Sequence, residues 1–379
     1  MGTAMSNFNK NDAFVRYGRY FTDAAEYFRN IALEIAEQPE LILQHLEHPI
    51  MKYLAQDRHS TCLERTKILE ALAYGDAGVM LAAPGPSLSG LIIRELGTTE
   101  QQELFYSYVS KNKARTFFAV TEPDKGSDAS NLQTKLIRKD NSSENFSLTG
   151  EKWLVGNGAS GTIGTVMARI APGPLGIVVV LLTPELLQQE NQLIRSKLPM
   201  ACLQGAQLAY LAFDSLAVPP TNVLGMQLPA TKRGLTAIIA TFNKMRPCVG
   251  ALALGLAQAV LDYISLERTK LLSNEKFKLA GLKTQLEVAR QLIHKAAVLA
   301  DTNPSDTAAI SLAKLNATHL AETITTIAFD YFGKGAFFEH PWLAKWYRDS
   351  FCFEFMEGTT QIQNNHIFAS ALKNEFLIK

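Results

Sequence analysis

The chain has 379 residues, with 37 Lys and Arg against 36 Asp and Glu and a formal net charge of +1. Hydrophobic residues make up 47% and charged residues 19%, which excludes a mainly disordered chain, because disorder requires low hydrophobicity or high net charge. Proteins that bind nucleic acid normally carry a basic excess, so the near-zero charge argues against that class. The length predicts two or three domains.

The sequence gives no sign of a membrane or metal-binding protein. The longest apolar runs, Ile177–Leu182 and Cys248–Ala257, are well short of the roughly 20 residues that span a bilayer. No basic region followed by an apolar segment marks a secretory signal, so we expect a cytoplasmic protein. The histidines have no metal-binding spacing, so no metal site is expected. The cysteines form no CxxC pair, so we expect small buried side chains rather than ligands or bridges at Cys62, Cys202, Cys248 and Cys352.

The first part of the chain has a helical period. Between Asp12 and about Lys113, apolar residues such as Phe21, Ala24 and Phe28 recur at the spacing of one helix face. Two prolines around a glycine interrupt this pattern within Leu81–Gly90. We therefore expect a helical domain over residues 5–114.

The middle of the chain is dominated by short strands. Apolar or alternating runs separated by Gly, Pro, Asn, Asp and Ser clusters predict strands at Thr116–Thr121, Leu132–Arg138, Phe146–Val155, Thr162–Ile170, Ile177–Leu182 and Gln207–Phe213. No helical pattern separates them, which favours an antiparallel barrel or sandwich over a sheet of βαβ units. This domain is predicted over residues 115–225.

The helical period returns in a third domain, predicted over residues 226–379. The expected helices are Arg246–Leu266, Lys283–Asp301 and Asp306–Phe329. The first is nearly uncharged, so it is expected to be buried on most sides. The predicted fold class is therefore α+β, mostly α, with a small β domain between two helical ones.

Two glycine-bearing segments are candidates for chemistry. Thr121–Asp128 follows a predicted strand, where its glycine allows a ligand to approach and its hydroxyl groups can donate hydrogen bonds, although an ordinary acidic turn has the same composition. In Phe353–Gln363, Glu357 lies between apolar residues and a glycine. Burial there would raise the pKa of the carboxyl group toward neutrality and make it a general base. The alternative is an acid that interacts with a helix dipole. No Rossmann, P-loop or nucleophile-elbow motif occurs.

Seven segments occur in an order and spacing typical of one enzyme family: Gly97–Gln102, Phe118–Asp128, Gly150–Gly158, Arg246-Pro247, Gly255–Gln258, Arg348-Asp349 and Glu357–Gln363. On these segments the chain resembles the acyl-CoA dehydrogenase family over nearly its whole length. The resemblance implies that family's fold: an N-terminal helical domain, a middle β-barrel or sandwich and a C-terminal four-helix bundle.

The resemblance also implies FAD as cofactor and Glu357 as catalytic base. Glu357 would take the α proton of an acyl thioester while the β carbon gives hydride to the flavin. In the family, the base's own backbone N–H and a flavin hydroxyl stabilise the enolate oxygen. The implied FAD contacts within the subunit are Phe118, Val120, Thr121, Gly126, Ser127, Leu154, Gly156, Thr359 and Gln361. The implied substrate contacts are Ser127, Phe242, Asn243, Arg246 and Gly358.

Some positions depart from the family pattern. Leu154 stands where the family usually has a Trp on the flavin, and Gly156 replaces a Thr or Ser, which removes a hydrogen bond of about 0.5–1.5 kcal/mol. The family's contacts to a partner subunit's FAD fall on a second set of residues: Arg268, Lys270, Asp330, Gly333 and Lys334. The Asp330 carboxylate would repel the FAD pyrophosphate unless Lys270 or Lys334 compensates, so either this contact is rebuilt or Asp330 turns away. We expect a homodimer or homotetramer.

The substrate is suggested by Ala83–Gly90, which resembles the subgroup that acts on acyl groups tethered to carrier proteins in polyketide and nonribosomal peptide pathways. That subgroup includes enzymes of hydroxymalonyl or aminomalonyl extender units, as in zwittermicin- and colibactin-type clusters. In that chemistry a seryl thioester is first oxidised to the aldehyde, which forms a hydrate. The hydrate would then lose an α proton and a β hydride and become a malonyl-type acid.

We therefore expect a dehydrogenase of a carrier-protein thioester, with an electron-transferring flavoprotein or oxygen as acceptor. No nucleic-acid or membrane partner is expected. One alternative is a fatty or short-chain acyl-CoA dehydrogenase of the β-oxidation type, in which Ala83–Gly90 is only a kinked helix. The other is a non-catalytic flavoprotein or scaffold, which the altered pyrophosphate residues suggest and the presence of Glu357 disfavours.

Overall fold

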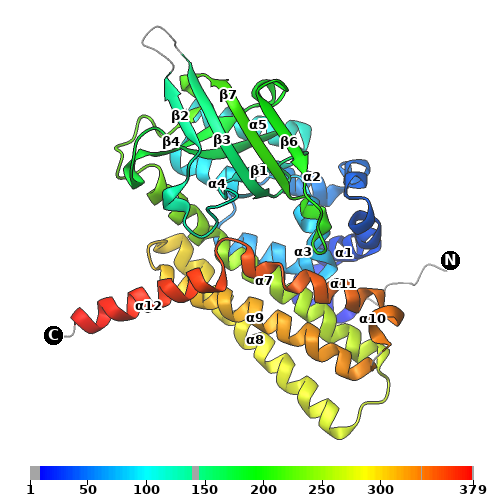
Figure 1. The fold of residues 1–379 in the computed structure, drawn as a ribbon. Helices are drawn as coiled ribbons and strands as arrows, with labels where there is room; N and C mark the ends of the chain where they lie inside the picture. The colour runs from blue at the N-terminus through cyan, green and yellow to red at the C-terminus, as the bar shows by residue number, and fades with distance from the viewer. Residues whose placement is uncertain (1–8, 139–144, 334, 378–379) are drawn as a thin grey trace.

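The computed structural model describes residues 9–138, 145–333 and 335–377, with helices on both sides of a sheet along the chain (Figure 1). The main N-terminal helices are α1 (Lys10–Glu37), α2 (Pro49–Ala55), α3 (Cys62–Ala82), α4 (Ser87–Leu96) and α5 (Thr99–Asn112). The C-terminal ones are α7 (Leu235–Glu267), α8 (Ser273–Thr302), α9 (Thr307–Phe332), α10 (Ala336–Glu339), α11 (Pro341–Ser350) and α12 (Thr360–Leu377). This order confirms the predicted sequence of helical, sheet and helical parts.

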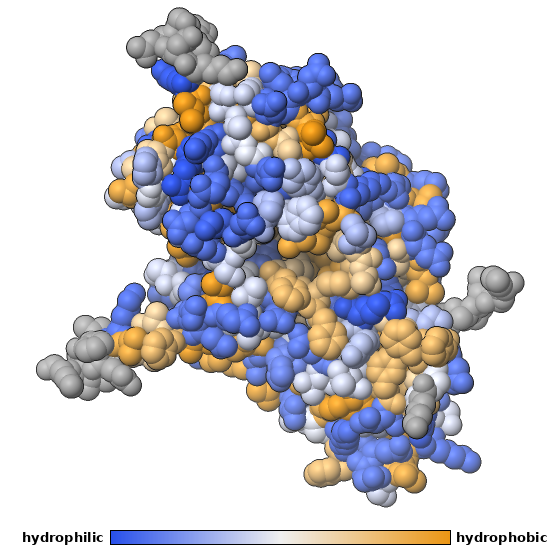
Figure 2. Space-filling model, viewed as in Figure 1, coloured by the Kyte–Doolittle hydropathy of each residue, from blue (hydrophilic) through white to orange (hydrophobic). Residues whose placement is uncertain are grey.

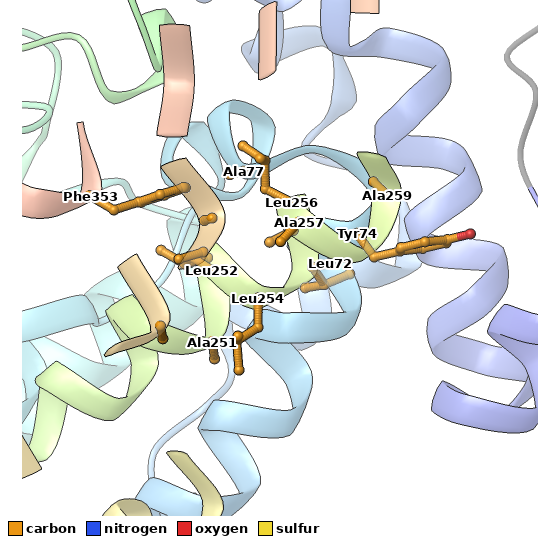
Figure 3. Close-up of a cluster of buried hydrophobic side chains, with 14 of the residues drawn as sticks. Leu72, Tyr74, Ala77, Ala251, Leu252, Leu254, Leu256, Ala257, Ala259 and Phe353 are labelled. Carbon is orange, nitrogen blue, oxygen red and sulfur yellow. The ribbon is translucent and has the colours of Figure 1, made fainter. Parts of the chain in front are cut away.

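The two helical parts share one core, centred on α3 and α7. Figure 3 shows Leu72 of α3 close to Leu254 and Leu256 of α7, and all three are buried. Close packing requires glycine at position 255, because a Cβ there would lie 2.3 Å from the carbonyl oxygen of Glu70. Both helices also line the candidate active-site cavity, so their contact fixes the position of two of its walls.

Helix α7 is long and apolar enough to cross a membrane, but 89% of its apolar window is buried inside the protein. Burial on most sides accounts for this composition, as the sequence predicted. Helices α8 and α9 pack beside α7, and α12 extends from this bundle toward the C-terminus (Figure 1).

The strands form one mixed sheet. They are β1 (Thr116–Ala119), β2 (Lys135–Arg138), β3 (Phe146–Val155), β4 (Ile163–Arg169), β5 (Ile177–Leu182), β6 (Leu193–Lys197), β7 (Ala209–Val218) and β8 (Val223–Leu224). The order is β6-β7-β3-β2-β4-β5-β8, with β1 beside β4. The expectation of antiparallel pairing was wrong for β4, which pairs parallel with both β1 and β2. Local sequence could not reveal this, because long connections allow strands distant along the chain to pair in parallel.

Strands β4 and β5 are buried on both faces, which joins the sheet to the helices. On one face Val166, Val178 and Val180 pack within the β domain. On the other, Met167 and Val179 contact a cluster built from α4, α5 and the start of α7. Successive side chains of a strand point to opposite faces, so these two strands serve both cores and hold the sheet against the helices.

The cysteine prediction was wrong for one pair. Cys202, in the loop after β6, forms a disulfide with Cys352, which follows α11. The two residues are 150 positions apart, so their spacing carried no signal of pairing. Cys62 and Cys248 are free and buried, as expected.

Candidate active site

A cavity of about 800 Å³ lies between the sheet and the helices. It is lined by β1 and the loop after it, the end of β3, α3, α4, α7 and the segment that precedes α12. Figure 2 shows apolar side chains gathered beside the hollow between the β domain and the helices. The cavity is large enough for a cofactor and a small substrate group.

Glu357 lines this cavity from a tight loop whose backbone is left-handed at Glu357 (φ +52°) and Gly358 (φ +105°). Three side chains hold the loop by its carbonyl groups. Arg246 Nε donates to the Glu357 carbonyl at 3.1 Å. Gln363 Nε2 donates to the Gly358 carbonyl at 2.9 Å, and Lys314 Nζ donates to the same oxygen at 3.0 Å. These bonds leave the Glu357 carboxylate itself available to the cavity.

Burial dominates the electrostatics around this carboxylate. It raises the pKa of Glu357 to about 7, although the positive charges of Lys314 and Arg246 act in the opposite direction. Burial also lowers the pKa of Lys314 to about 8 and that of Arg246 to about 10. A carboxylate with a pKa near the working pH is suited to general base catalysis.

The loop after β1 is held by a buried ion pair. Lys152 Nζ lies 2.9 Å from Glu122 Oε1 and donates to the Val120 carbonyl at 2.9 Å. Glu122 also accepts hydrogen bonds from the backbone N–H and the hydroxyl group of Thr134. This pair fixes the start of the loop from which Thr121 lines the cavity.

The end of β3 presents two large side chains to the cavity. The register of β3 against β7 shifts between Lys152 and Val155, and Leu154 has a left-handed backbone (φ +57°). As a result both Trp153 and Leu154 line the cavity. The resemblance placed Leu154 at the position where the family usually has a Trp. Trp153 lines the cavity one residue earlier.

Open space and an unpaired acceptor beside this strand fit FAD. A Cβ at Gly156 would meet only the Ala206 carbonyl oxygen, at 3.8 Å, and a Cβ at Gly126 would meet nothing within 4 Å. Asn157 Oδ1 is buried and has no hydrogen-bond partner among the residues that the structure describes, while Asn157 Nδ2 donates to the Leu81 carbonyl at 3.1 Å. A flat cofactor with polar edges would fill this space and could pair with that oxygen.

Most residues that the resemblance placed at the site line this one cavity: Phe118, Val120, Thr121, Gly126, Ser127, Leu154, Gly156, Phe242, Arg246, Glu357, Gly358 and Thr359. Asn243 does not line it. Asn243 is fully buried behind the wall, where its amide nitrogen donates to the Pro304 carbonyl at 2.6 Å and its oxygen accepts from Arg246. Gln361 is exposed and outside the cavity.

The residues assigned to a partner subunit's FAD also lie outside the cavity. Arg268 is 3.6 Å from Glu275, Lys270 is exposed, and Gly333 ends α9. Asp330 is paired with Lys278 at 3.0 Å, so neither of the two expected lysines is its partner within the described part of the chain. Lys334 lies outside the described residues.

Sequence reasoning missed the residues that support the site. Gln363, Lys152 and Glu122 lie within the motif segments, but no supporting role was predicted for them. Lys314 carried no signal, because a lysine that becomes buried looks the same in sequence as one on the surface. In the structure Lys152 lies on the buried side of β3.

Comparison with known proteins identifies the family. Residues 117–216 match the acyl-CoA dehydrogenase middle domain and residues 232–372 its C-terminal domain. The short-chain specific acyl-CoA dehydrogenase of Megasphaera elsdenii is 30% identical over 310 residues, 78% of each chain.

Solved structures agree. Butyryl-CoA dehydrogenase from Megasphaera elsdenii superposes with a TM-score of 0.75 at 26% identity, covering 92% of this chain and 98% of that one. The prolyl acyl carrier protein oxidase AnaB does so with a TM-score of 0.76 over the same shares, and at 21% identity this likeness concerns the fold alone. The chain thus belongs to the acyl-CoA dehydrogenase family and is an FAD-dependent dehydrogenase of acyl thioesters.

Proposed function

We propose that Glu357 removes the α proton of an acyl thioester bound in the cavity. The observation that carries this role is a carboxylate in the cavity wall whose pKa burial raises to about 7. At neutral pH such a group is ionised often enough to accept a proton and basic enough to hold it. FAD, when bound, supplies the acceptor for the hydride that leaves the β carbon.

The loop around Glu357 suits the second requirement of this chemistry, which is stabilisation of the enolate oxygen. Negative charge on the thioester oxygen needs hydrogen-bond donors that are already in place. The family resemblance assigns one of them to the backbone N–H of Glu357. Because Arg246, Lys314 and Gln363 hold the loop through its carbonyl groups, that N–H would keep its position while the proton moves.

We further propose that the acyl group is tethered to a carrier protein. The proposal rests on the segment Ala83–Gly90, of which Ala83–Leu88 form part of the cavity wall. Gly85 has φ +151° and its N–H donates to the Ala114 carbonyl at 3.1 Å, and Ser87 has φ +47° at the start of α4. Two prolines and this bond make the wall rigid, which suits a small, defined acyl group. AnaB, which shares this fold, is by its name an oxidase of a prolyl acyl carrier protein, so the fold is compatible with a substrate of this class.

The specific form of this proposal is formation of an aminomalonyl-type extender unit from a seryl-derived thioester. The hydrate of its aldehyde offers an α hydrogen to Glu357 and a β hydrogen that leaves as hydride, and the resulting enediol tautomerises to the malonyl-type acid. A short-chain acyl-CoA substrate is the second candidate, favoured by the 30% identity to the Megasphaera elsdenii enzyme.

The test compares one acyl group on three carriers: a carrier protein, free pantetheine and CoA. The holoenzyme is mixed with each thioester without oxygen, and loss of flavin absorbance is followed. Intact-protein mass spectrometry of the loaded carrier protein detects the oxidised product. We expect the highest kcat/KM on the carrier protein. Turnover on the CoA thioester together with none on the carrier-protein thioester would leave the β-oxidation type as the function.

A further inference from the structure

The loop between β6 and β7, residues 198–208, forms one wall of the cavity. Four of its residues line the cavity: Met200, Leu203, Ala206 and Leu208. The Ala206 carbonyl accepts a hydrogen bond from the Asn157 N–H at 2.7 Å, and its oxygen is the atom that a Cβ at Gly156 would meet. The loop therefore borders the space that fits FAD.

The Cys202–Cys352 disulfide joins this loop to the segment that carries Glu357. Cys202 precedes Leu203 in the loop, while Cys352 lies shortly before Glu357 and lines the cavity itself. Both cysteines are only partly buried. An accessible disulfide is open to exchange with thiols, so this covalent link between two walls of the cavity can be broken by a reductant.

Other bonds hold the same two walls independently of the sulfur atoms. The Leu203 N–H donates to Asp349 Oδ1 at 2.7 Å. Lys345 Nζ lies 2.6 Å from Asp349 Oδ2 and 2.6 Å from Asp76 Oδ2, and all three side chains are buried. Because this network needs no disulfide, reduction should leave the fold intact and act only on the cavity wall next to the cysteines.

The backbone of the loop shows why that wall needs a constraint. Leu203 and Gln207 both have left-handed conformations, each with φ +44°. A residue other than glycine adopts this conformation at a cost in energy, and it persists only where the surroundings enforce it. Cys202 is the neighbour of Leu203, so opening its bond to Cys352 removes one of these constraints. The loop can then relax and move its side chains away from the FAD space.

We propose that the Cys202–Cys352 disulfide is a redox-controlled clamp on the FAD pocket, so that the oxidised enzyme retains FAD and reduction by a dithiol weakens FAD binding. In this exchange a dithiol gives two electrons and two protons to the disulfide. The bond between the two sulfur atoms breaks, each cysteine becomes a thiol, and the dithiol closes to its own disulfide. The inference goes beyond the proposed function, because it concerns retention of the cofactor and not the acyl substrate.

The test compares FAD release from the holoenzyme in its two redox states. The holoenzyme is equilibrated with oxidised or with reduced dithiothreitol and diluted in steps, and released FAD is followed by its fluorescence. Alkylation and mass spectrometry of each sample report whether Cys202 and Cys352 are bonded. We expect reduction to raise the dissociation constant of FAD by about tenfold, which is within the usual range of coupling between two sites. Unchanged FAD affinity in samples whose disulfide has opened would overturn the inference.

Coupling between the two sites must be reciprocal, which gives a second measurement. FAD should protect the disulfide by the same factor by which the disulfide strengthens FAD binding. The ratio of reduced to oxidised dithiothreitol that opens half of the disulfide should therefore rise about tenfold when excess FAD is added to holoenzyme diluted until its FAD has dissociated. An equal ratio with and without FAD would contradict the clamp.

Cys202→Ser opens the link without a reductant and leaves Cys352 in the cavity wall, since Cys202 does not line the cavity. This variant should bind FAD about tenfold more weakly, and dithiothreitol should weaken it no further. The matched control is Cys62→Ser, which removes a free, buried thiol and should respond to dithiothreitol as the unmodified enzyme does. A response that persists in Cys202→Ser, or that disappears in Cys62→Ser, would assign it to other thiols and overturn the inference.

Circular dichroism separates a clamp from a support of the whole fold. The helical content of the unmodified enzyme should be the same in both redox states, because the Leu203–Asp349 bond and the pairs of Lys345 remain. Loss of helical content together with FAD would make the disulfide a structural link and overturn the inference. None of these outcomes changes the role of Glu357, which is tested by flavin reduction in the oxidised holoenzyme.

Discussion

Replacing Glu357 by Gln is the most direct test of the proposed mechanism, because it removes the base and keeps the size of the side chain. A general base contributes about a hundredfold to ten-thousandfold to rate, so we expect kcat to fall by that range. FAD content should be unchanged, since the bonds from Arg246, Lys314 and Gln363 reach backbone carbonyl groups of the loop and not the carboxylate. The variant should unfold at the same temperature or higher above pH 7, because Gln has no charge to desolvate.

The pH dependence gives the same test a second readout. The active form of Glu357 is the carboxylate, and its pKa is about 7, so kcat/KM should rise as the pH increases through that value. Between pH 6 and pH 8 the ionised fraction grows from about 0.09 to about 0.91, a tenfold increase. The assay is anaerobic flavin reduction by a thioester across this range. Undiminished activity in Glu357→Gln, or a pH step that persists in its residual activity, would refute the assignment of Glu357 as base.

Three further substitutions test the supporting residues. Lys314→Met should slow turnover by about tenfold and move the pH step upward, because the positive charge of Lys314 lowers the pKa of Glu357; a step at unchanged pH would contradict this. Lys152→Met leaves the Glu122 carboxylate buried without its cation, so it should lower the free energy of unfolding in urea by about 3–5 kcal/mol. The control is Lys135→Met, at an exposed position of β2, which should change this free energy little. Gly156→Ser should fold normally, since a Cβ there meets only the Ala206 oxygen at 3.8 Å. The substitution should shift the flavin reduction potential, which dye equilibration measures. An unchanged potential would mean that position 156 does not reach the flavin.

The order of domains could be predicted because each part of the chain has its own hydrophobic period. The alternation along β7 and the apolar character of α7 are both visible in the sequence, although α7 begins at Leu235, before the predicted start at Arg246. The short strands β6 and β8 were missed, because β6 is mostly polar and β8 has only two residues. The parallel pairing of β1 and β2 with β4 was missed for a different reason: which strands pair depends on the fold as a whole.

Within the site, the motif residues and Arg246 could be predicted, but the supporting roles of Lys314 and Gln363 could not. Glu357 stands in a recognisable motif, but the three side chains that fix its loop come from α7, α9 and α12. Their spacing in the sequence is set by the path of the chain around the bundle and not by the chemistry they share. Asn243 was predicted as a substrate contact, but its buried amide holds Arg246 from behind and does not contact the cavity.

The buried lysines of this chain differ in what satisfies them. Lys152 faces Glu122, Lys345 is held between Asp76 and Asp349, and Lys314 donates to two backbone carbonyl groups. A cation satisfied in this way supports structure, because removing it leaves its partners unpaired.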